Sequence, residues 1–208
     1  MSASNIGRTV RVLFFDSETT GLPMMTERFV FPHYKELDKY NSCRLIELGY
    51  IITDEGTDHI RETKKYNSLV IPPCEITNSE IHGITTEEAT LKGNTLTQVL
   101  STFIEDLSTV DLIVAHNIEF DLNVVCSELF RNARFTEAST LFDKPKMCTM
   151  EISRKKYGYR RKLCDLYEEL SDQNWKQTHR AMDDAEKCKE CYFLLASLSS
   201  GTSYDEQR

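Results

Sequence analysis

The sequence lacks several features that would place the protein in a membrane or outside the cell. No apolar run is long enough to span a bilayer, so we expect no membrane partner. Residues 1–5 lead straight into an apolar segment, which does not have the form of a secretory signal. The seven cysteines are scattered and odd in number, so they cannot all form disulfides. These absences predict a cytoplasmic or nuclear protein with free thiols in a reducing compartment.

Positive charge is also scarce. There are 25 Lys and Arg side chains against 33 Asp and Glu, and the formal net charge is −8. This balance argues against broad electrostatic wrapping of duplex nucleic acid, although it leaves room for a local basic patch. It also suits a site that is crowded with acids and needs metal ions.

The chain has no internal repeat and no linker that would divide it. Its 208 residues are 40% hydrophobic and 28% charged, which is sufficient for one ordinary domain with a substantial core. We therefore predict a single domain over residues 7–198. The polar residues 199–208 are expected to form a flexible C-terminal tail.

The first strong signal is an apolar run that ends in two carboxylates. Residues 10–15 have the length and β-branched content of a buried strand, and Asp16 and Glu18 follow. Because strand side chains alternate, these two carboxylates point to the same face and repel each other. Hard divalent ions with oxygen ligands would relieve that repulsion. For this pair alone a surface loop would be the better interpretation, so a site requires further acids at the same point.

The remaining segments indicate further strands and helices. Strands are expected at residues 45–52, 60–71, 111–116 and 147–150, and helices at 78–83, 85–90, 96–107, 117–131, 163–170 and 178–198. Short links between the first three strands favour an antiparallel meander. The order predicts an α/β fold with a central mixed five-stranded sheet, in which the meander is joined by parallel strands and flanked by helices. Residues 22–43 are interpreted as a long loop with a helical turn at 35–39.

Two more acids fall on the apolar stripes of predicted helices. Asn117 is a good N-cap for a helix whose apolar stripe includes Asp121. Thr178 is the predicted cap of the last helix, whose stripe includes Asp184. An ionised Asp on a core-facing stripe must be paired or bound to metal. Because ligands bind at the carboxyl ends of strands in such sheets, we expect these acids to join the pair that ends the first strand.

Four carboxylates in one cluster would repel one another without cations. Two divalent ions about 3.5–4 Å apart would neutralise them and bracket a scissile phosphate. Mg²⁺ suits carboxylate, water and phosphate ligands, and Mn²⁺ should substitute for it. His179 precedes Asp184 by five positions, an angular offset of about 140° on a helix, so it should lie at or before the first turn. There its pKa range suits it to take a proton from an attacking water.

These segments together resemble the DEDDh 3′-to-5′ exonucleases, the DnaQ-like family that includes polymerase proofreading subunits. The first acidic motif is FDSETTGL at residues 15–22, the second is VAHNIEFD at 114–121, and the third is HRAMDD at 179–184. IELG at 46–49 is similar to the family's second strand, and IHGI at 81–84 to its substrate-side turn. The five motifs stand in the family's order and cover nearly the whole chain.

The resemblance implies an RNase H-like fold and a two-metal site. Carried over residue by residue, it makes His179 the general base, and the metal ligands are Asp16, Glu18, Asp121 and Asp184. The resemblance also implies contacts to the 3′-terminal nucleotides. Thr19 would contact the terminal nucleotide through its backbone N–H, and the side chains that would pack against the terminal bases are Leu22, Ile81 and Phe120. His82 would approach the terminal nucleotide or its phosphate, and Asn117 would help to shape the pocket. Stacking on side chains tolerates every base, as an exonuclease requires.

By the same resemblance, we expect a metal-dependent 3′-to-5′ exonuclease that releases nucleoside 5′-monophosphates. Single-stranded DNA or a frayed DNA 3′ end is the favoured substrate, in proofreading or repair, and RNA or short oligoribonucleotides are the alternative. A polymerase or another replication or repair protein is a candidate partner. A non-catalytic binding module is the rival of another class, but it would have no reason to keep four acids and His179. An aspartyl phosphotransferase with Asp16 as nucleophile would need a Lys clamp that the first motif does not offer.

Other polar residues have structural interpretations. His116 is expected to be structural, Asp183 solvated, and Glu47 outward-facing or hydrogen-bonded rather than a ligand. The spacing of Cys188 and Cys191 is that of a metal-binding pair, but within a helix and without a second pair it favours packing.

Several features leave alternatives open. Without the family match, His82 would be interpreted as a surface turn residue. The loop at residues 23–43 is longer than is common between the family's first two strands, and Cys148-Thr149 stands where many relatives have Asp-Thr. The basic cluster at residues 154–162 is either a solvated loop or a phosphate contact.

Overall fold

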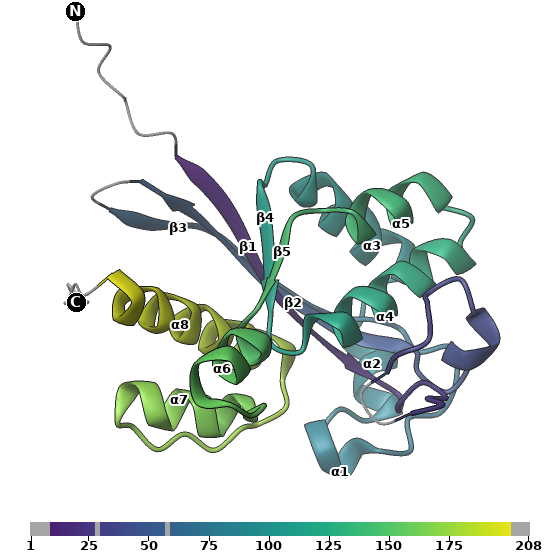
Figure 1. Cartoon of the computed structure of the whole chain (residues 1–208). Helices are drawn as coiled ribbons and strands as arrows, with labels where there is room; N and C mark the ends of the chain where they lie inside the picture. Colours follow the sequence, from purple (N-terminus) through teal and green to yellow (C-terminus); the bar gives the residue numbers. More distant parts are fainter. Residues whose placement is uncertain (1–8, 28–29, 57–58, 201–208) are drawn as a thin grey trace, which may run out of the picture.

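A five-stranded sheet forms the centre of the molecule (Figure 1). The computed structural model describes residues 9–27, 30–56 and 59–200. In the order β3-β2-β1-β4-β5, the strands are β1 (Val10–Thr19), β2 (Leu45–Glu55), β3 (Ile60–Leu69), β4 (Leu112–Ala115) and β5 (Lys146–Cys148). β2 pairs antiparallel with both β1 and β3, whereas β4 pairs parallel with β1 and β5 parallel with β4. The predicted meander and mixed sheet are confirmed.

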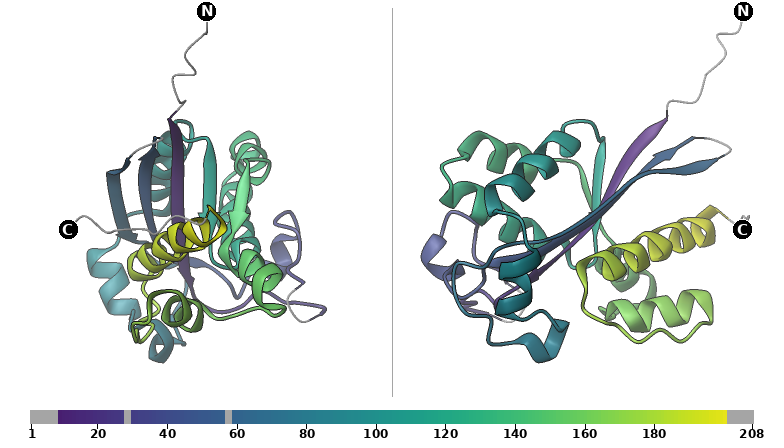
Figure 2. Two further views of the ribbon diagram at one scale, coloured as in Figure 1. Left: turned by 60° about the vertical axis from the view of Figure 1, so that its left-hand side comes forward. Right: turned by 180° about the vertical axis from the view of Figure 1, so that it is seen from behind.

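Helices cover both faces of this sheet (Figure 2). One face carries α3 (Leu96–Leu107), α4 (Ile118–Arg131) and α5 (Phe135–Phe142), and the other carries α6 (Thr149–Tyr157), α7 (Leu163–Ser171) and α8 (Ala181–Ser200). The short helices α1 (Ser79–His82) and α2 (Thr86–Lys92) follow β3. In the part of the chain that the structure describes, no helix is long and apolar enough to cross a membrane.

Strand alternation in β1 divides the core into two layers. Leu13 and Phe15 pack in a cluster with residues of α3 and α4, whereas Val12 and Phe14 pack with residues of α7 and α8. All four side chains are fully buried. Residues 12–15 of β1 are therefore all apolar, as expected for a central strand that is covered on both faces. The same alternation decides which layer each residue at the end of the strand faces.

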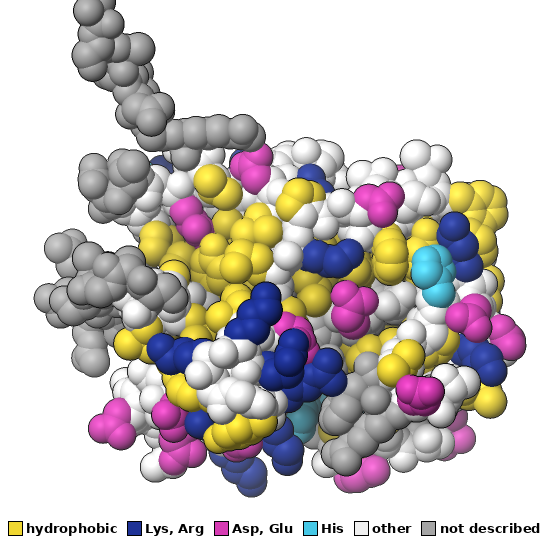
Figure 3. All heavy atoms as spheres, in the orientation of Figure 1, with side chains coloured by type: hydrophobic (Ala, Val, Ile, Leu, Met, Phe, Trp, Pro, Cys, Tyr) yellow, Lys and Arg dark blue, Asp and Glu magenta, His cyan; other side chains and the backbone are white. Residues whose placement is uncertain are grey.

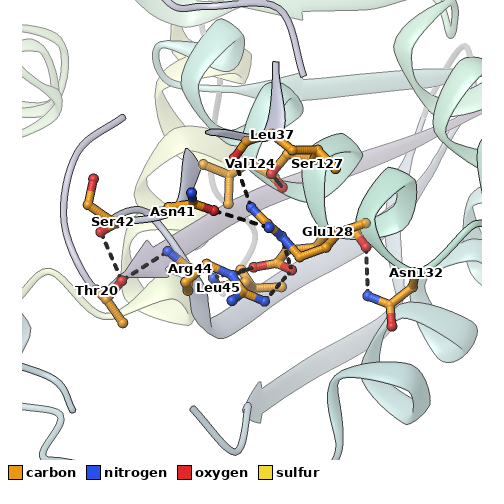
Figure 4. A network of polar contacts seen from close by, with 11 residues as sticks. Thr20, Leu37, Asn41, Ser42, Arg44, Leu45, Val124, Ser127, Glu128 and Asn132 are labelled. Carbon is orange, nitrogen blue, oxygen red and sulfur yellow. Dashed lines mark hydrogen bonds and ion pairs between the residues drawn. The ribbon is translucent and has the colours of Figure 1, made fainter. Parts of the chain in front are cut away.

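A buried ion pair joins the start of β2 to α4 (Figure 4). Glu128 is 1% exposed, and its carboxylate accepts hydrogen bonds from Arg44 Nε at 2.7 Å and Nη2 at 3.0 Å. The Leu45 N–H donates to the same carboxylate at 3.3 Å. Losing one partner of such a pair leaves an uncompensated buried charge, which is strongly destabilising. The pair therefore fixes β2 against α4.

The long loop between β1 and β2 is anchored to the core. In its described part, Tyr34 is buried, and the Tyr34 N–H donates to Asn123 Oδ1 of α4 at 3.0 Å. The helical turn in this loop is the 3₁₀ turn η1 (Leu37–Tyr40), which starts two residues later and ends one residue later than predicted.

Neither residue predicted as an N-cap makes a capping hydrogen bond to its helix. Asn117 stands at the N-cap position of α4, as predicted, but its backbone is left-handed with φ of 68°, and its side chain makes no capping hydrogen bond. α8 begins at Ala181, and the Thr178 hydroxyl donates instead to the Asp183 carboxylate at 2.7 Å. The first turn of α8 is capped from another element, because Glu47 Oε2 of β2 accepts from the Ala181 N–H at 3.0 Å. Local sequence gives no signal for such a long-range cap.

The last third of the chain differs from the prediction in three ways. α5 was not predicted, and neither was α6, which begins directly after β5. The strand predicted at residues 147–150 is therefore wrong in position and lies at 146–148. The first part of the basic cluster, residues 154–157, is the end of α6 rather than a loop. α8 ends at Ser200, two residues beyond the predicted end of the last helix, and residues 201–208 of the predicted tail lie outside the described residues.

The seven cysteines are all free, as predicted. Cys188 and Cys191 are buried in the same cluster as α7, which confirms that their spacing reflects packing.

Candidate active site

The end of β1 presents two carboxylates toward α8. The side chains two and four positions before Asp16 face the layer of α7 and α8, so strand alternation places Asp16 and Glu18 on that side. In the register with β2, Asp16 lies opposite Gly49 and Glu18 lies opposite Glu47. The register shifts directly after Glu18, so the regular ladder ends at the second acid.

The missing side chain at Gly49 lets α8 approach the sheet here. A Cβ at this position would lie 2.5 Å from the Met182 nitrogen and 2.6 Å from the Ala181 carbonyl carbon. The first turn of α8 therefore packs against the backbone of β2, next to Asp16. Asp184 lies in the same turn and is 3% exposed. A larger residue at position 49 would push α8 away from the acids of β1.

Asp121 reaches the cluster from the opposite layer. β4 runs parallel to β1, so α4 starts beside the end of β1, and Asp121 lies in the first turn of α4. Its buried Oδ1 accepts hydrogen bonds from the Ser17 N–H at 3.0 Å and from the Ser17 hydroxyl at 2.7 Å. By strand alternation, Ser17 faces the α4 side between the two acids of β1. These two bonds hold Asp121 at the end of β1.

Burial and neighbouring negative charges raise the pKa values of all four carboxylates. Burial and the charges of Asp121, Asp184 and Glu18 raise the pKa of Asp16 well above its usual value. Burial and the charges of Asp184, Glu47 and Asp121 raise the pKa of Glu18 to about 9. Burial also raises the pKa values of Asp121 and Asp184 to about 7, although each accepts hydrogen bonds that oppose the change. The structure thus brings the four predicted acids together.

These four carboxylates have no cationic partner among the residues that the structure describes. Within residues 9–27, 30–56 and 59–200, no Lys or Arg forms an ion pair with any of them. Gln177 Nε2 donates to Asp184 Oδ2, but Asp184 Oδ1 is buried without a hydrogen-bond partner. Ligand atoms of Glu18, His179 and Asp184 all lie within 4.8 Å of one another. Crowded carboxylate oxygens without a counter-ion are a donor set that fits a hard divalent cation.

Glu47, the cross-strand neighbour of Glu18, is neutralised by the protein itself. Its fully buried carboxylate accepts hydrogen bonds from Arg180 Nε at 3.0 Å and Nη2 at 2.7 Å, from the Ala181 N–H at 3.0 Å and from Asn67 Nδ2 at 3.0 Å. Burial alone would raise the pKa of Glu47, but these hydrogen bonds bring it below its usual value. The hydrogen-bonded interpretation of Glu47 is confirmed.

His179 lies on the bend that leads into α8. It precedes the helix, as its spacing from Asp184 predicted, and its φ of 52° is in the left-handed region that few residues other than glycine adopt. This bend holds the imidazole beside Glu18 and Asp184. Burial and the charge of Lys162 lower the pKa of His179 below 6.5, so the ring is neutral at pH 7 and able to accept a proton.

Two neighbouring polar residues have the structural character that was predicted. His116 Nε2 donates to the Arg161 carbonyl at 3.0 Å, since a carbonyl only accepts, and His116 Nδ1 accepts from the Thr149 hydroxyl at 2.9 Å. Burial lowers the pKa of His116 to about 4, so its ring stays neutral. Asp183 is exposed to solvent.

Most residues implied to contact nucleotides lie on segments next to the end of β1. Leu22 and Ile81 are 62% and 51% exposed, which is unusual for large apolar side chains. Phe120 is partly buried and its ring centroid lies 5.6 Å from that of Phe31. Asn117 forms the left-handed link between β4 and α4, so its position brings Phe120 and Asp121 to the strand end.

α1 is tied to the end of β1. Asn78 Nδ2, just before α1, donates to the Thr19 carbonyl at 3.0 Å, and the Thr19 hydroxyl donates to the Gly21 carbonyl at 2.8 Å. His82 is 3% exposed, so the interpretation as a surface turn residue is wrong. Its Nδ1 accepts from the Ile84 N–H at 3.1 Å, and its Nε2 is buried without a hydrogen-bond partner. Burial also lowers the pKa of His82, so Nε2 carries the proton of a neutral ring.

Sequence reasoning missed the roles of three residues in this site. Ser17 and Gln177 donate to the carboxylates of Asp121 and Asp184, and Arg180 neutralises Glu47. Ser17 and Arg180 stand inside two of the acidic motifs, and that position is the only signal the sequence offers for them.

The four acids are recognised as a candidate site by their chemistry, since they do not line the main cavity found in the described residues. A cavity of about 460 Å³ lies elsewhere, between β2, β3, α7 and α8, and its lining includes Thr53, Tyr167 and Phe193 but none of the four acids. The assignment of the candidate site therefore depends on charge and hydrogen bonding.

Sequence comparison gives a family match. Residues 13–192 match the RNase_T family, which is described as exonuclease. No curated protein sequence gives a significant match.

Solved exonuclease structures share the fold. The chain is similar to Exonuclease X in complex with 5′-overhanging duplex DNA, with 18% identity, a TM-score of 0.54, and coverage of 93% of this chain and 94% of that one. A 3′-exonuclease that recognises the histone mRNA stem-loop has 16% identity, a TM-score of 0.63 and coverage of 93% and 83%. Exonuclease I in an SSB/Exonuclease I structure with an inhibitor has 19% identity and a TM-score of 0.64, and the match covers 93% of this chain but 44% of that one. At these identities the likeness establishes the RNase H-like fold alone.

Proposed function

The chain belongs to the RNase_T family of exonucleases, and from that membership we propose a specific activity for it. It is a nuclease that hydrolyses nucleic acid stepwise from the 3′ end with divalent metal ions and releases nucleoside 5′-monophosphates. Its favoured substrate is single-stranded DNA or a frayed DNA 3′ end, in proofreading or repair. The observation that carries this proposal is the cluster of four carboxylates without a cationic partner beside the neutral imidazole of His179.

The residues that would hold two divalent ions, Mg²⁺ or Mn²⁺ in its place, are Asp16, Glu18, Asp121 and Asp184. When bound, the ions neutralise these carboxylates and polarise the scissile phosphate and the attacking water. The partnerless Oδ1 of Asp184 supports the proposal, as does the proximity of the Glu18 and Asp184 oxygens. The hydrogen bonds to Asp121 and Asp184 orient those carboxylates, as second-shell groups do at metal sites.

His179 acts as the general base. Its neutral imidazole has one nitrogen free of a proton, and its place on the bend before α8 holds the ring over the acids. That nitrogen takes the proton from the attacking water as the water adds to phosphorus. The imidazolium that results is stabilised by the negative charges of the neighbouring carboxylates.

The 3′-terminal nucleotides lie against the segments around the end of β1. Exposed Leu22 and Ile81, with Phe120, contact the faces of the terminal bases. The buried Nε2–H of His82 and the Thr19 backbone N–H donate to the terminal nucleotide, and Asn117 shapes the pocket wall. Because these contacts address base faces and backbone rather than base edges, sequence preference is weak.

RNA and short oligoribonucleotides are the second candidate substrate. The fold neighbours include one protein described with duplex DNA and one described with a histone mRNA stem-loop, so the shared fold serves either sugar. We further propose that the chain works in a reducing compartment, cytoplasmic or nuclear, which its seven free thiols support. A polymerase or another replication or repair protein is its proposed partner.

Degradation of 5′-labelled single strands, DNA beside RNA, in Mg²⁺, in Mn²⁺ and in EDTA tests this function. We expect a ladder that shortens from the 3′ end, disappears in EDTA and forms faster on DNA. Faster degradation of RNA would replace the first substrate by the second. No cleavage of either polymer in either metal would overturn the exonuclease proposal in favour of a binding module.

His179→Ala separates the general base from the metal ligands. We expect the hydrolysis rate to fall by about 10²–10⁴-fold, the usual contribution of a general base, while Mn²⁺ binding persists. Loss of Mn²⁺ binding in this variant would show that His179 is a ligand instead.

A further inference from the structure

A basic segment, defined as residues 154–162, stands out on an otherwise acidic protein. Six of its nine residues are cationic and two are tyrosines, whereas the whole chain has a net charge of −8. The segment comprises the end of α6 and the link to α7. Figure 3 shows Lys and Arg side chains gathered over α6 and the chain that follows it. The activity proposed above does not use this concentration of charge.

The basic segment is attached to the candidate active site. The carbonyl of Arg161 accepts from Nε2 of His116, which directly precedes the link into α4. The other nitrogen of the same ring is bonded to Thr149, the first residue of α6. Lys162 lies near enough to His179 for its charge to lower the pKa of that imidazole. The segment therefore lies beside His179 and beside the residue that precedes the link into α4.

Each arginine of the basic segment forms an ion pair within the protein, although two of them share one carboxylate. Arg154 and Arg160 lie 2.6 Å and 2.7 Å from the carboxylate of Glu151, and Arg161 lies 3.3 Å from that of Glu169. These pairs hold all three guanidinium groups in place and offset most of their charge.

The lysines of the basic segment are different. Lys155, Lys156 and Lys162 are exposed, and none of them forms an ion pair with any residue that the structure describes. Ammonium groups that face water in this way are the usual contacts for backbone phosphates.

Two tyrosine rings lie close to the Arg161 guanidinium. Its guanidinium carbon lies 4.5 Å from the Tyr157 ring centroid and 5.0 Å from the Tyr159 ring centroid. Tyr159 is itself 57% exposed, so it presents ring surface to solvent from a fixed support. An exposed aromatic ring beside unpaired cations is the combination by which proteins bind single strands without reading sequence.

We propose that the basic segment binds the substrate strand on the 5′ side of the nucleotides in the active site. Lys155, Lys156 and Lys162 contact successive backbone phosphates, with Lys162 nearest the site, and Tyr159 stacks on a base. A single strand fits this short patch, whereas the overall negative charge opposes the broad contact that a duplex makes. The inference rests on the proposed function, since it concerns the strand that enters the same site.

Binding of a 5′-fluorescein-labelled single strand of about 12 nucleotides tests the inference, with Asp16→Asn in all chains to stop hydrolysis. Lys155→Gln/Lys156→Gln is compared with Arg61→Gln/Lys65→Gln, which removes the same charge from β3. We expect the first pair to weaken binding about tenfold and to reduce the slope of log K against log salt by about 1.4, or 0.7 per phosphate contact. Tyr159→Ala should weaken binding about tenfold with little change in the slope.

Hydrolysis by chains with the native Asp16 gives a second readout. The rate on the long strand relative to the rate on a dinucleotide should fall in Lys155→Gln/Lys156→Gln and not in the β3 control. An unchanged salt slope, equal losses in both variants, or equal losses on both substrate lengths would overturn the inference. If the native chain hydrolyses neither substrate, the proposed function fails, while the binding comparison still decides whether the basic segment binds a strand.

Discussion

Two groups of acids lie on or against the same sheet and have opposite surroundings. Glu47 and Glu128 are at most 1% exposed, and each forms a two-bond ion pair with an arginine, Arg180 and Arg44 respectively. The four acids of the candidate site have no such partner within the described residues. The two groups differ in their counter-ions far more than in their burial.

Glu18 and Glu47 make the contrast sharpest, because they lie opposite each other in the ladder of β1 and β2. Hydrogen bonds from Arg180 bring the pKa of Glu47 below its usual value in spite of burial, whereas burial and neighbouring acids raise the pKa of Glu18 to about 9. The paired acids hold strands and helices together. The unpaired acids carry a repulsion that the fold does not relieve, which is the state expected of a site that takes its cations from solution.

Asp16→Asn is the strongest test of the unpaired group. It removes one ligand and one repelling charge, so nuclease activity should fall by at least about 10³-fold, corresponding to several kcal/mol of lost transition-state stabilisation. The free energy of unfolding in EDTA should stay equal or increase. Rate assays measure the loss of activity, and urea unfolding measures the stability. A variant with full activity would contradict the assignment of Asp16 as a metal ligand.

Arg44→Met breaks the paired group instead. The buried carboxylate of Glu128 would lose its counter-ion, so the free energy of unfolding should fall by about 3–5 kcal/mol. Arg44→Met/Glu128→Gln is the matched control, because it removes both charges and should regain part of the loss. Urea unfolding measures both variants. A single variant as stable as the native chain would show that the pair does not hold the fold.

The pH dependence of stability also distinguishes the two groups of acids, with a smaller expected effect than either substitution. Burial and neighbouring charges raise the pKa of Glu18 from 4.5 to about 9, and those of Asp16, Asp121 and Asp184 are raised as well. The folded metal-free chain therefore holds more protons than the unfolded chain, and its free energy of unfolding should fall as pH rises through about 4.5 to 9. Mg²⁺ binds the deprotonated carboxylates, so it should restore stability most at the alkaline end.

Urea unfolding at about pH 5 and about pH 9, in EDTA and in Mg²⁺, measures this effect. Asp16→Asn should reduce the decline in EDTA. A metal-free chain whose stability rises across this window would contradict the raised pKa values.

Ser17→Ala should have the smallest effect. It removes the hydroxyl that donates to Asp121 but keeps the backbone N–H bond to the same oxygen. Metal affinity should fall by about tenfold, the lower end for an outer-shell partner, with little change in stability. Mn²⁺ titration of the variant checks this, and an unchanged affinity would show that the backbone bond alone orients Asp121.

The sheet and the four acids were predictable because they follow local periodicity. Strand alternation puts Asp16 and Glu18 on one side, and helical spacing puts Asp121 and Asp184 on the inward faces of α4 and α8. The start of α8 was not predictable in this way, because it is fixed by a carboxylate of β2. Asn117 was assigned as a cap by propensity, but Asn also tolerates the left-handed region, and the link from β4 to α4 uses that property.

The failure to predict α6 has a different cause. The apolar residues at 147 and 150 are too few to distinguish a strand from a helix start, and the following residues 154–156 are all cationic, which favoured a loop. α6 is nevertheless formed, with Thr149 and Ser153 buried on its inner face. Tertiary packing therefore makes this segment helical, although its local sequence favours a loop.

Calorimetric titration of the metal-free chain with Mn²⁺, in two buffers of different ionisation enthalpy, tests the central claim most directly. If the four acids bind cations that the protein does not supply, the native chain should bind two ions and release protons, and Asp16→Asn should lose both effects. The account would be contradicted if the native chain bound no Mn²⁺. It would also be contradicted if Mn²⁺ bound without proton release and Asp16→Asn bound it equally well.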